Sequence, residues 1–228
     1  MNKTAENRIQ LNTIQKLAAE RMLYSKQTKP CCYIEAKADV TELISLRPAL
    51  RKLLGVKITT NSFYIKAIAL AVRQYPLMIA KLNGDFLDVA DSINVGFAVS
   101  APQGLVVPVI RNADKKTLKD IAVEEKVLTE KARSNKLTLE DIEQETIALS
   151  NLGSFDIDSF IAIPPPQTSA ILAAGNTLNT IVPKDGLITN RKMVSFCLAV
   201  DNRIINEIYA AGFLKCLINH LENPNELI

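Results

Sequence analysis

The last third of the chain contains three strand-length apolar stretches, and they constrain the fold more than any other feature. The stretches are ETIALSNLG at 145–153, TSAILAAGNTLNTIV at 168–182 and RKMVSFCLAV at 191–200, and the turn PKDG joins the last two. Apolar runs of this length that are bounded by turn residues are typical of strands in a largely buried sheet. The sequence therefore predicts a central sheet, against which the helices of the preceding two thirds must pack.

Helical and strand patterns alternate through the first two thirds of the chain. Helices are predicted at 11–24, 41–54, 62–76 and 118–134, and strands at 31–40 and in a hairpin over 92–113 whose turn is PQG. Thr117 with Asp120, and Thr138 with Asp141, have the spacing of capping boxes and bracket the charged fourth helix. Pro108 confines the second strand of the hairpin to an edge or a bulge. This order predicts an α/β protein of the two-layer α+β type, a mixed sheet with helices packed on one face.

Composition limits the compartment and the partners. The chain has 228 residues, of which 48% are hydrophobic, so residues 1–228 are expected to form a single domain, with 1–10 as a polar N-terminal arm. The net charge of +3 arises from 27 basic and 24 acidic residues spread along the chain, which argues against a nucleic-acid partner. No apolar run is typical of a signal peptide or a membrane span, so we expect a cytoplasmic location and no membrane contact. Four cysteines without CxxC spacing and a single histidine argue against a metal site.

The stretch VDNRIINEIYAAGFL at 200–214 joins the last strand to a final amphipathic helix. Strand-to-helix junctions of this kind often carry catalytic side chains, because a loop on a rigid scaffold can present them. This junction carries two amides, Asn202 and Asn206, four positions apart. The sequence therefore predicts a site built like an active site but without an obvious proton acceptor.

Several stretches, in order, resemble the catalytic core of the dihydrolipoamide acyltransferases of 2-oxo acid dehydrogenase complexes. The most specific are GLVVPVIRNADKKTL at 104–118 and SNLGSFDIDSFIAIPPPQTSAILAAG at 150–175, and LENPNELI resembles the carboxyl end of the family. VDNRIINEIYAAGFL is similar to the family's active-site motif, Asp-His-Arg-x-x-Asp-Gly followed by a helix. The resemblance implies the fold of chloramphenicol acetyltransferase and a trimer with active sites between neighbouring subunits. It also implies acyl transfer between a dihydrolipoamide thiol and coenzyme A.

The chain departs from the family motif at the positions that carry its chemistry. Asn202 stands where the family has its catalytic histidine, and Asn206 and Glu207 stand where it has Asp and Gly. An amide nitrogen cannot accept a proton near neutral pH, so Asn202 cannot act as the base. By resemblance, Ser150 donates a hydrogen bond to the oxyanion of the tetrahedral intermediate. The alternative for Ser150 is a serine at a strand end that caps a turn.

The resemblance also implies that Cys31, Cys32 and Tyr33 line the substrate pocket, in a segment where the family usually has a histidine and an aromatic residue. The two thiols are either potential nucleophiles or small buried residues of a strand. His220 is the only histidine, and it follows Asn206 by 14 residues, or about 21 Å along a continuous helix. We therefore expect His220 to lie outside this site within one subunit.

Three functions remain open. The first is a catalytically degenerate acyltransferase core, a pseudoenzyme that acts as a structural or scaffold subunit. Such a subunit would form a homotrimer or a larger shell, alone or together with active acyltransferase subunits or other components of the complex. The second is an active acyltransferase that works without the histidine base, and the third is a module that binds acyl-coenzyme A. Coenzyme A is the only cofactor that the resemblance implies. Because the core begins almost at Met1, we expect no lipoyl group, lipoyl domain or peripheral-subunit-binding domain on this chain.

Overall fold

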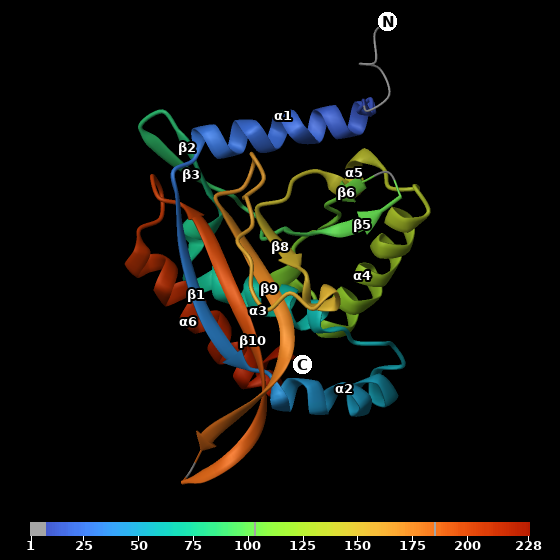
Figure 1. Cartoon of the computed structure of the whole chain (residues 1–228), viewed down its shortest axis with the longest axis vertical. Helices are drawn as coiled ribbons and strands as arrows, with labels where there is room; N and C mark the ends of the chain where they lie inside the picture. Colours follow the sequence, from blue (N-terminus) through green and yellow to red (C-terminus); the bar gives the residue numbers. More distant parts are fainter. Residues whose placement is uncertain (1–7, 103, 185) are drawn as a thin grey trace, which may run out of the picture.

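A mixed sheet of six strands lies at the centre of the protein (Figure 1), in a computed structural model that describes residues 8–102, 104–184 and 186–228. The strands, in the order in which they pair, are β1 (Cys31–Asp39), β10 (Leu187–Asp201), β9 (Ala170–Lys184), β8 (Ile147–Asn151), β4 (Val95–Phe97) and β7 (Val109–Ile110). Strand β8 runs parallel to both of its neighbours, β9 and β4, whereas the other pairs are antiparallel. The predicted mixed sheet is confirmed, and the apolar runs of the last third form β8 and the two longest strands, β9 and β10.

Helices α3 and α6 cover one face of this sheet and complete the main core (Figure 1). The helices are α1 (Thr13–Thr28), α2 (Thr41–Leu54), α3 (Thr60–Gln74), α4 (Leu118–Arg133), α5 (Leu139–Ile142) and α6 (Glu207–Glu222), with short 3-10 turns η1 (Pro76–Ile79), η2 (Ala113–Lys115), η3 (Gly153–Phe155) and η4 (Pro224–Leu227). Helix α3 is buried on most of its circumference, as its sequence predicts. Its Tyr64 meets Phe196 of β10 edge to face, with ring centroids 5.1 Å apart.

Side-chain caps fix where several helices begin. Thr117 and Asp120 form a capping box at the start of α4, and Thr138 and Asp141 form another at the start of α5, so both predicted signatures are confirmed. Helix α1 begins later than the predicted 11–24, because a capping box at Asn12 fixes its first turn. It also ends later, at Thr28. Each box satisfies amide groups that the first turn of a helix leaves unpaired.

The predicted hairpin over 92–113 divides between two sheets. Its inner parts are β4 and β7 of the main sheet, and its outer parts, β5 (Val99–Ala101) and β6 (Gly104–Val106), form a separate antiparallel pair. Pro108 lies just before β7, an edge strand, as predicted. Gln103 of the predicted turn lies outside the described residues. A second small hairpin, β2 (Ala80–Asn83) with β3 (Phe86–Val89), was not predicted, although its two-residue Gly84-Asp85 turn is a hairpin signal.

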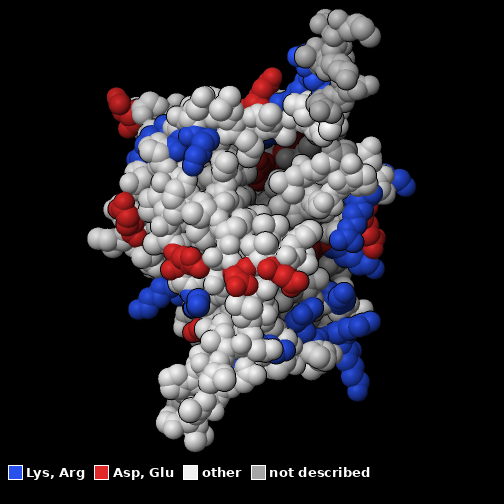
Figure 2. All heavy atoms as spheres, viewed as in Figure 1, with Lys and Arg blue, Asp and Glu red and all other residues white. Residues whose placement is uncertain are grey.

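The sheet's second face carries small side chains and is crossed by the loop at 155–166. Ala148, Ile171 and Ala199 form a minor cluster there, packed against Ala162 of the loop. On the side of the molecule that Figure 2 shows, acidic side chains form a row across the middle, and basic side chains gather over α2. The face therefore carries charges of both signs.

Gly175 of β9 allows this loop to approach the sheet. The amide of Asn176 donates a hydrogen bond of 2.7 Å to the carbonyl oxygen of Ile157. A Cβ atom at position 175 would lie 1.9 Å from the carbonyl oxygen of Asp158, far closer than any carbon–oxygen contact. The loop can thus cross the strand only where the side chain is absent.

We expect Gly175→Ala to lower the free energy of unfolding by about 2–4 kcal/mol, because the loop must move away from β9. The measurement is urea unfolding followed by circular dichroism. Gly186→Ala is a suitable control, since a Cβ there meets nothing within 4 Å and costs only the strain of a positive φ, about 1–2 kcal/mol. Equal losses for the two variants would show that the loop adapts without cost.

Candidate active site

The loop that leaves β10 is held by an ion pair between its own residues. Asp201 closes the strand with 1% of its surface exposed, and its carboxylate accepts two hydrogen bonds from the Arg203 guanidinium, at 2.9 Å and 2.6 Å. The same carboxylate accepts a third from the Arg203 amide at 3.1 Å. These hydrogen bonds raise the pKa of Arg203, so the guanidinium remains charged. Asp201 is therefore committed to Arg203 and does not serve as a free base.

The two amides of the junction have different surroundings. Asn206 is the N-cap of α6, and its side-chain oxygen accepts a hydrogen bond of 2.9 Å from the Tyr209 amide. Asn202 is exposed, and its side-chain nitrogen donates a hydrogen bond of 3.2 Å to a carboxylate oxygen of Glu207. Positions 202 and 207 both depart from the family motif, and the structure places them in contact. The group nearest to the expected catalytic position is therefore a carboxylate.

Ser150 lies on the sheet's second face, away from Asn202. It pairs with Ala173 of β9, which pairs in turn with Cys197 of β10. Asn202 follows Cys197 by five residues, so it lies roughly 16 Å further along the strand direction and two strand spacings, about 10 Å, to the side. Within one chain, Ser150 and Asn202 cannot contact the same small group.

Cys31, Cys32 and Tyr33 open β1, next to the end of β10. Cys31 pairs with Asp201, and consecutive strand residues point to opposite faces, so the two thiols cannot act on one group together. Burial raises the pKa of both thiols, and the charges of Asp201 and Glu207 add to this for Cys31 and Cys32, respectively. Both thiols therefore remain protonated at neutral pH. This favours the interpretation of Cys31 and Cys32 as small strand residues over their interpretation as nucleophiles. Tyr33 is 38% exposed and accepts a hydrogen bond of 3.2 Å from Lys26.

A buried lysine, which the sequence did not predict as part of the site, links α1 to the loop before β9. The Lys29 ammonium donates hydrogen bonds to the carbonyl oxygens of Pro165, Pro166 and Thr168 at 2.6, 2.9 and 2.6 Å. One turn earlier, the Ser25 hydroxyl donates to the Pro164 carbonyl at 2.6 Å. Proline has no N–H, so this run cannot continue a regular backbone ladder, and its carbonyl oxygens accept from neighbouring groups; that of Pro165 also accepts from the Thr168 amide and hydroxyl. The triple proline was correctly predicted to be a loop, but its partner lies 136 residues away.

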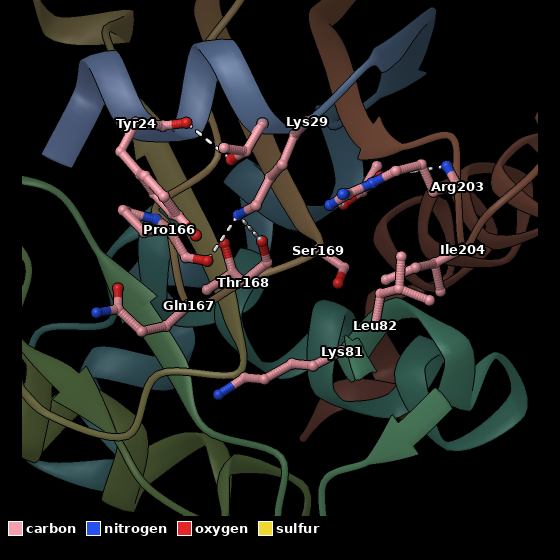
Figure 3. A pocket seen from close by; sticks show the side chains of 12 residues that line it. Tyr24, Lys29, Lys81, Leu82, Pro166, Gln167, Thr168, Ser169, Arg203 and Ile204 are labelled. Atoms are coloured by element: carbon pink, nitrogen blue, oxygen red, sulfur yellow. Dashed lines mark hydrogen bonds and ion pairs between the residues drawn. The ribbon is translucent and has the colours of Figure 1, made fainter. Parts of the chain in front are cut away.

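Lys29 and Arg203 face each other across a pocket of about 230 Å³ (Figure 3). Burial lowers the pKa of Lys29 to about 8, so the side chain still carries its proton at neutral pH. Asp201 also lines this pocket and balances part of the positive charge. The pocket thus lies between the end of β10 and the end of α1, and its charged lining includes Lys29, Asp201 and Arg203.

Within residues 8–102, 104–184 and 186–228, no cluster of three or more His, Cys, Asp or Glu side chains is arranged to hold a metal ion. No helix in this part of the chain is long and apolar enough to cross a membrane. His220 lies near the end of α6, where it contacts Cys216 and Glu226, and so lies outside the junction as expected.

The fold defines the class of protein first. Chloramphenicol acetyltransferase superposes with a TM-score of 0.57 over 89% of this chain and 94% of its own, at 14% sequence identity, so the two share a fold. The family model for the catalytic domain of 2-oxoacid dehydrogenase acyltransferases matches residues 3–228. The chain belongs to this family.

Relatives in the family share about a third of their residues with the chain. The pyruvate dehydrogenase acetyltransferase components of Rickettsia bellii and Dictyostelium discoideum are 34% and 36% identical over 93% and 95% of it. The chain spans 52% and 35% of the length of these two relatives. A solved cubic core of a pyruvate dehydrogenase complex superposes with a TM-score of 0.93 at 31% identity, over 97% of this chain and 93% of that one.

The dihydrolipoamide acetyltransferase of Azotobacter vinelandii superposes equally well, with a TM-score of 0.93, 31% identity and the same coverage. The roles of a serine, a histidine and an asparagine in its catalytic mechanism have been investigated, and these residues are separated by 52 and 4 positions. Ser150, Asn202 and Asn206 have the same two separations. By this spacing, the last position is an asparagine in the relative as well, so Asn206 is not a departure from every member of the family.

We expect Lys29→Met to lower the free energy of unfolding by about 2–4 kcal/mol, because the carbonyl oxygens of Pro166 and Thr168 lose their donor and that of Pro165 loses one of its three donors. Thermal unfolding monitored by circular dichroism measures this loss. Lys26→Met is the matched control, since Lys26 lies three residues earlier in α1 and is exposed. A loss no larger than that of the control would mean that water replaces the ammonium at no cost.

Proposed function

We propose that this chain is an acyltransferase core of a 2-oxo acid dehydrogenase complex that moves an acyl group between coenzyme A and a dihydrolipoamide-type thiol. Family membership supports the reaction class. The observation that carries the proposal is the separation of Ser150, Asn202 and Asn206, which equals that of the three residues investigated in the Azotobacter enzyme. Only the middle residue of the three differs, and this position contacts Glu207.

The reaction exchanges one thioester for another. The acceptor thiol attacks the acyl carbon, its proton passes to a base, and the same proton returns to the departing thiolate of coenzyme A. We assign Ser150 as the donor to the oxyanion, a role that typically contributes a factor of about 10² to 10³. We assign Glu207 as the proton acceptor, because its carboxylate lies 3.2 Å from the amide that replaces the imidazole.

This assignment predicts a slow enzyme. Carboxylates titrate near 4.3, far below the pKa of about 8.5 of a thiol, so they are weaker bases than imidazole. General-base catalysis contributes a factor of about 10² to 10⁴ in rate, and part of this factor is lost here. Because a thiol is a few per cent ionised at pH 7 and strongly nucleophilic, transfer continues at a reduced rate.

The proposal includes a trimer with sites at the junctions between subunits. Ser150 of one chain and Asn202 of the same chain are too far apart to share a substrate, so a site that uses both needs two copies. The β9–β10 hairpin, which extends below the rest of the molecule in Figure 1, exposes apolar side chains suited to such contacts. Ile181 and Ile188 are 74% and 83% exposed in the single chain.

A second candidate is the scaffold subunit, and the absence of the imidazole at position 202 favours it. The hydrogen bonds that shape the junction do not involve the side chain at position 202. In these bonds, Arg203 donates to Asp201 and the Tyr209 amide donates to Asn206. A subunit could therefore lose its base and still assemble with active acyltransferase chains. The acyltransferase and the scaffold subunit can be distinguished by whether replacing Ser150 lowers a measurable rate of acyl transfer.

We expect Asn202→His to raise the rate of acetyl transfer from acetyl-coenzyme A to dihydrolipoamide by about 10- to 1,000-fold, because it restores an imidazole base. Ser150→Ala should lower the wild-type rate by about 10²-fold, and Glu207→Gln by at least tenfold. Release of coenzyme A and formation of the acetyl thioester, followed by mass spectrometry, give the rates. Glu130→Gln, on the exposed side of α4, is the matched control for a lost carboxylate.

A wild-type rate equal to that of Ser150→Ala would contradict the proposal and favour the scaffold. If only Glu207→Gln leaves the rate unchanged, the reaction class stands but another group accepts the proton. Binding of coenzyme A without turnover would favour the acyl-coenzyme A binding module.

Mixed trimers test the junction between subunits. We expect Ser150→Ala/Asn202→His chains, co-expressed in equal amounts with wild-type chains, to give about a quarter of the rate of Asn202→His trimers. In such mixtures, about a quarter of the junctions pair a histidine from a variant chain with Ser150 from a wild-type chain. Neither chain alone carries both groups. A rate no higher than the sum of the separate chains would show that the site does not span subunits.

A further inference from the structure

The only histidine of the chain connects a cysteine to a glutamate. Cys216 and His220 lie one turn apart on α6, with 3.8 Å between Sγ and Nε2. On the other side of the ring, His220 Nδ1 lies 3.0 Å from a carboxylate oxygen of Glu226, in the turn η4. A thiol, an imidazole and a carboxylate thus form a continuous chain, the arrangement that activates a nucleophile.

The carboxylate determines the position of the ring proton. An ionised Glu226 can only accept, so Nδ1 must carry the hydrogen of this contact. In the neutral ring, Nε2 then keeps its lone pair, and this lone pair faces the Cys216 thiol. His220 is therefore oriented to take a proton from Sγ.

The group lies partly inside the protein, beside an open hollow. The His220 side chain is 12% exposed, and Cys216 is half-buried against the core. His220 lines a pocket of about 330 Å³ together with Leu70, Arg73 and Gln74 of α3. The pocket offers an apolar wall, a cation and an amide, which suit a short acyl group attached to an anionic or polar carrier.

We propose that Cys216, His220 and Glu226 form a second nucleophilic site, which accepts an acyl group from small activated esters or thioesters. The Cys216 sulfur forms a bond to the acyl carbon, and the bond from that carbon to the leaving oxygen or sulfur breaks. The thiol proton passes to His220 and then to the leaving group. Glu226 is a positioning residue, because it acts on the ring and does not touch the acyl group.

Proton transfer during the attack is essential at this site. Burial raises the pKa of the Cys216 thiol, and the charge of Glu226 raises it further, so little thiolate forms in advance. His220 must accept the proton as the new bond forms, as in a serine–histidine pair. The site lies about 21 Å along α6 from Asn206, so it acts independently of the junction.

Acylation with p-nitrophenyl acetate tests the site on the intact protein. We expect a burst of about one equivalent of p-nitrophenolate per chain, with the acetyl group on the peptide that contains Cys216 by mass spectrometry. Cys216→Ala should abolish this burst, whereas Cys197→Ala, a buried strand cysteine, should leave it unchanged. His220→Gln should slow acetylation of Cys216 by about 10- to 100-fold.

An independent measurement addresses the role of Glu226. Because the chain has one histidine, its ring nitrogens give a single pair of ¹⁵N resonances, and we expect the neutral form protonated at Nδ1. Glu226→Gln should shift this balance toward Nε2 protonation and slow the burst several-fold, and Glu226→Asp should restore part of both. Acetylation of Cys216 at the same rate with and without His220, or an Nε2-protonated ring in the wild type, would overturn the proposal.

Discussion

The pairing register of β8, β9 and β10 determines which groups this protein can bring to one substrate. Side chains in a sheet alternate between faces, so a shift of one residue in β8 would turn Ser150 toward the helices and Leu149 away from them. In the observed register, Leu149 belongs to the main core, and Ser150 lies opposite Ala173 on the other face. Asn202 lies beyond the end of β10. Ser150 and the Asn202–Glu207 contact thus lie at separate places in the same subunit, so the proposed chemistry depends on how subunits meet.

The junction after β10 keeps its shape without any contribution from the side chain at position 202. Its backbone is fixed by the Asp201–Arg203 pair and by the Asn206 cap. The backbone N–H of Asn202 also donates a hydrogen bond to the Pro30 carbonyl oxygen. Lys29 stabilises the neighbouring proline loop from the same side. Because these interactions use main-chain groups or other side chains, the side chain at position 202 can vary at little structural cost. The base can therefore change independently of the fold.

Local signals in the sequence were enough to predict most elements, but not the contacts that assemble the site. A capping box located the start of α4, and turn residues separated β9 from β10. The contacts of Lys29 could not be predicted, because no local pattern relates a lysine to carbonyl groups 136 residues away. The link between Asn202 and Glu207 depends on how the loop folds back on the first turn of α6. Cys216 and His220 are different, since their four-residue spacing on a helix places them on one face, and this signal is present in the sequence.

Thioester exchange makes the loss of the imidazole less severe than it would be for a serine nucleophile. A thiol with a pKa of about 8.5 is already a few per cent ionised at neutral pH, so full deprotonation by a base gains a factor of only about 30 in thiolate concentration. A hydroxyl donor to the oxyanion contributes about 10² to 10³, because it acts on charge that develops only in the transition state. Under the proposed function, a chain that keeps Ser150 and places a carboxylate beside the amide at position 202 therefore retains the oxyanion contribution and part of the contribution of the base. This is the physical reason that we propose for an acyltransferase tolerating asparagine at this position.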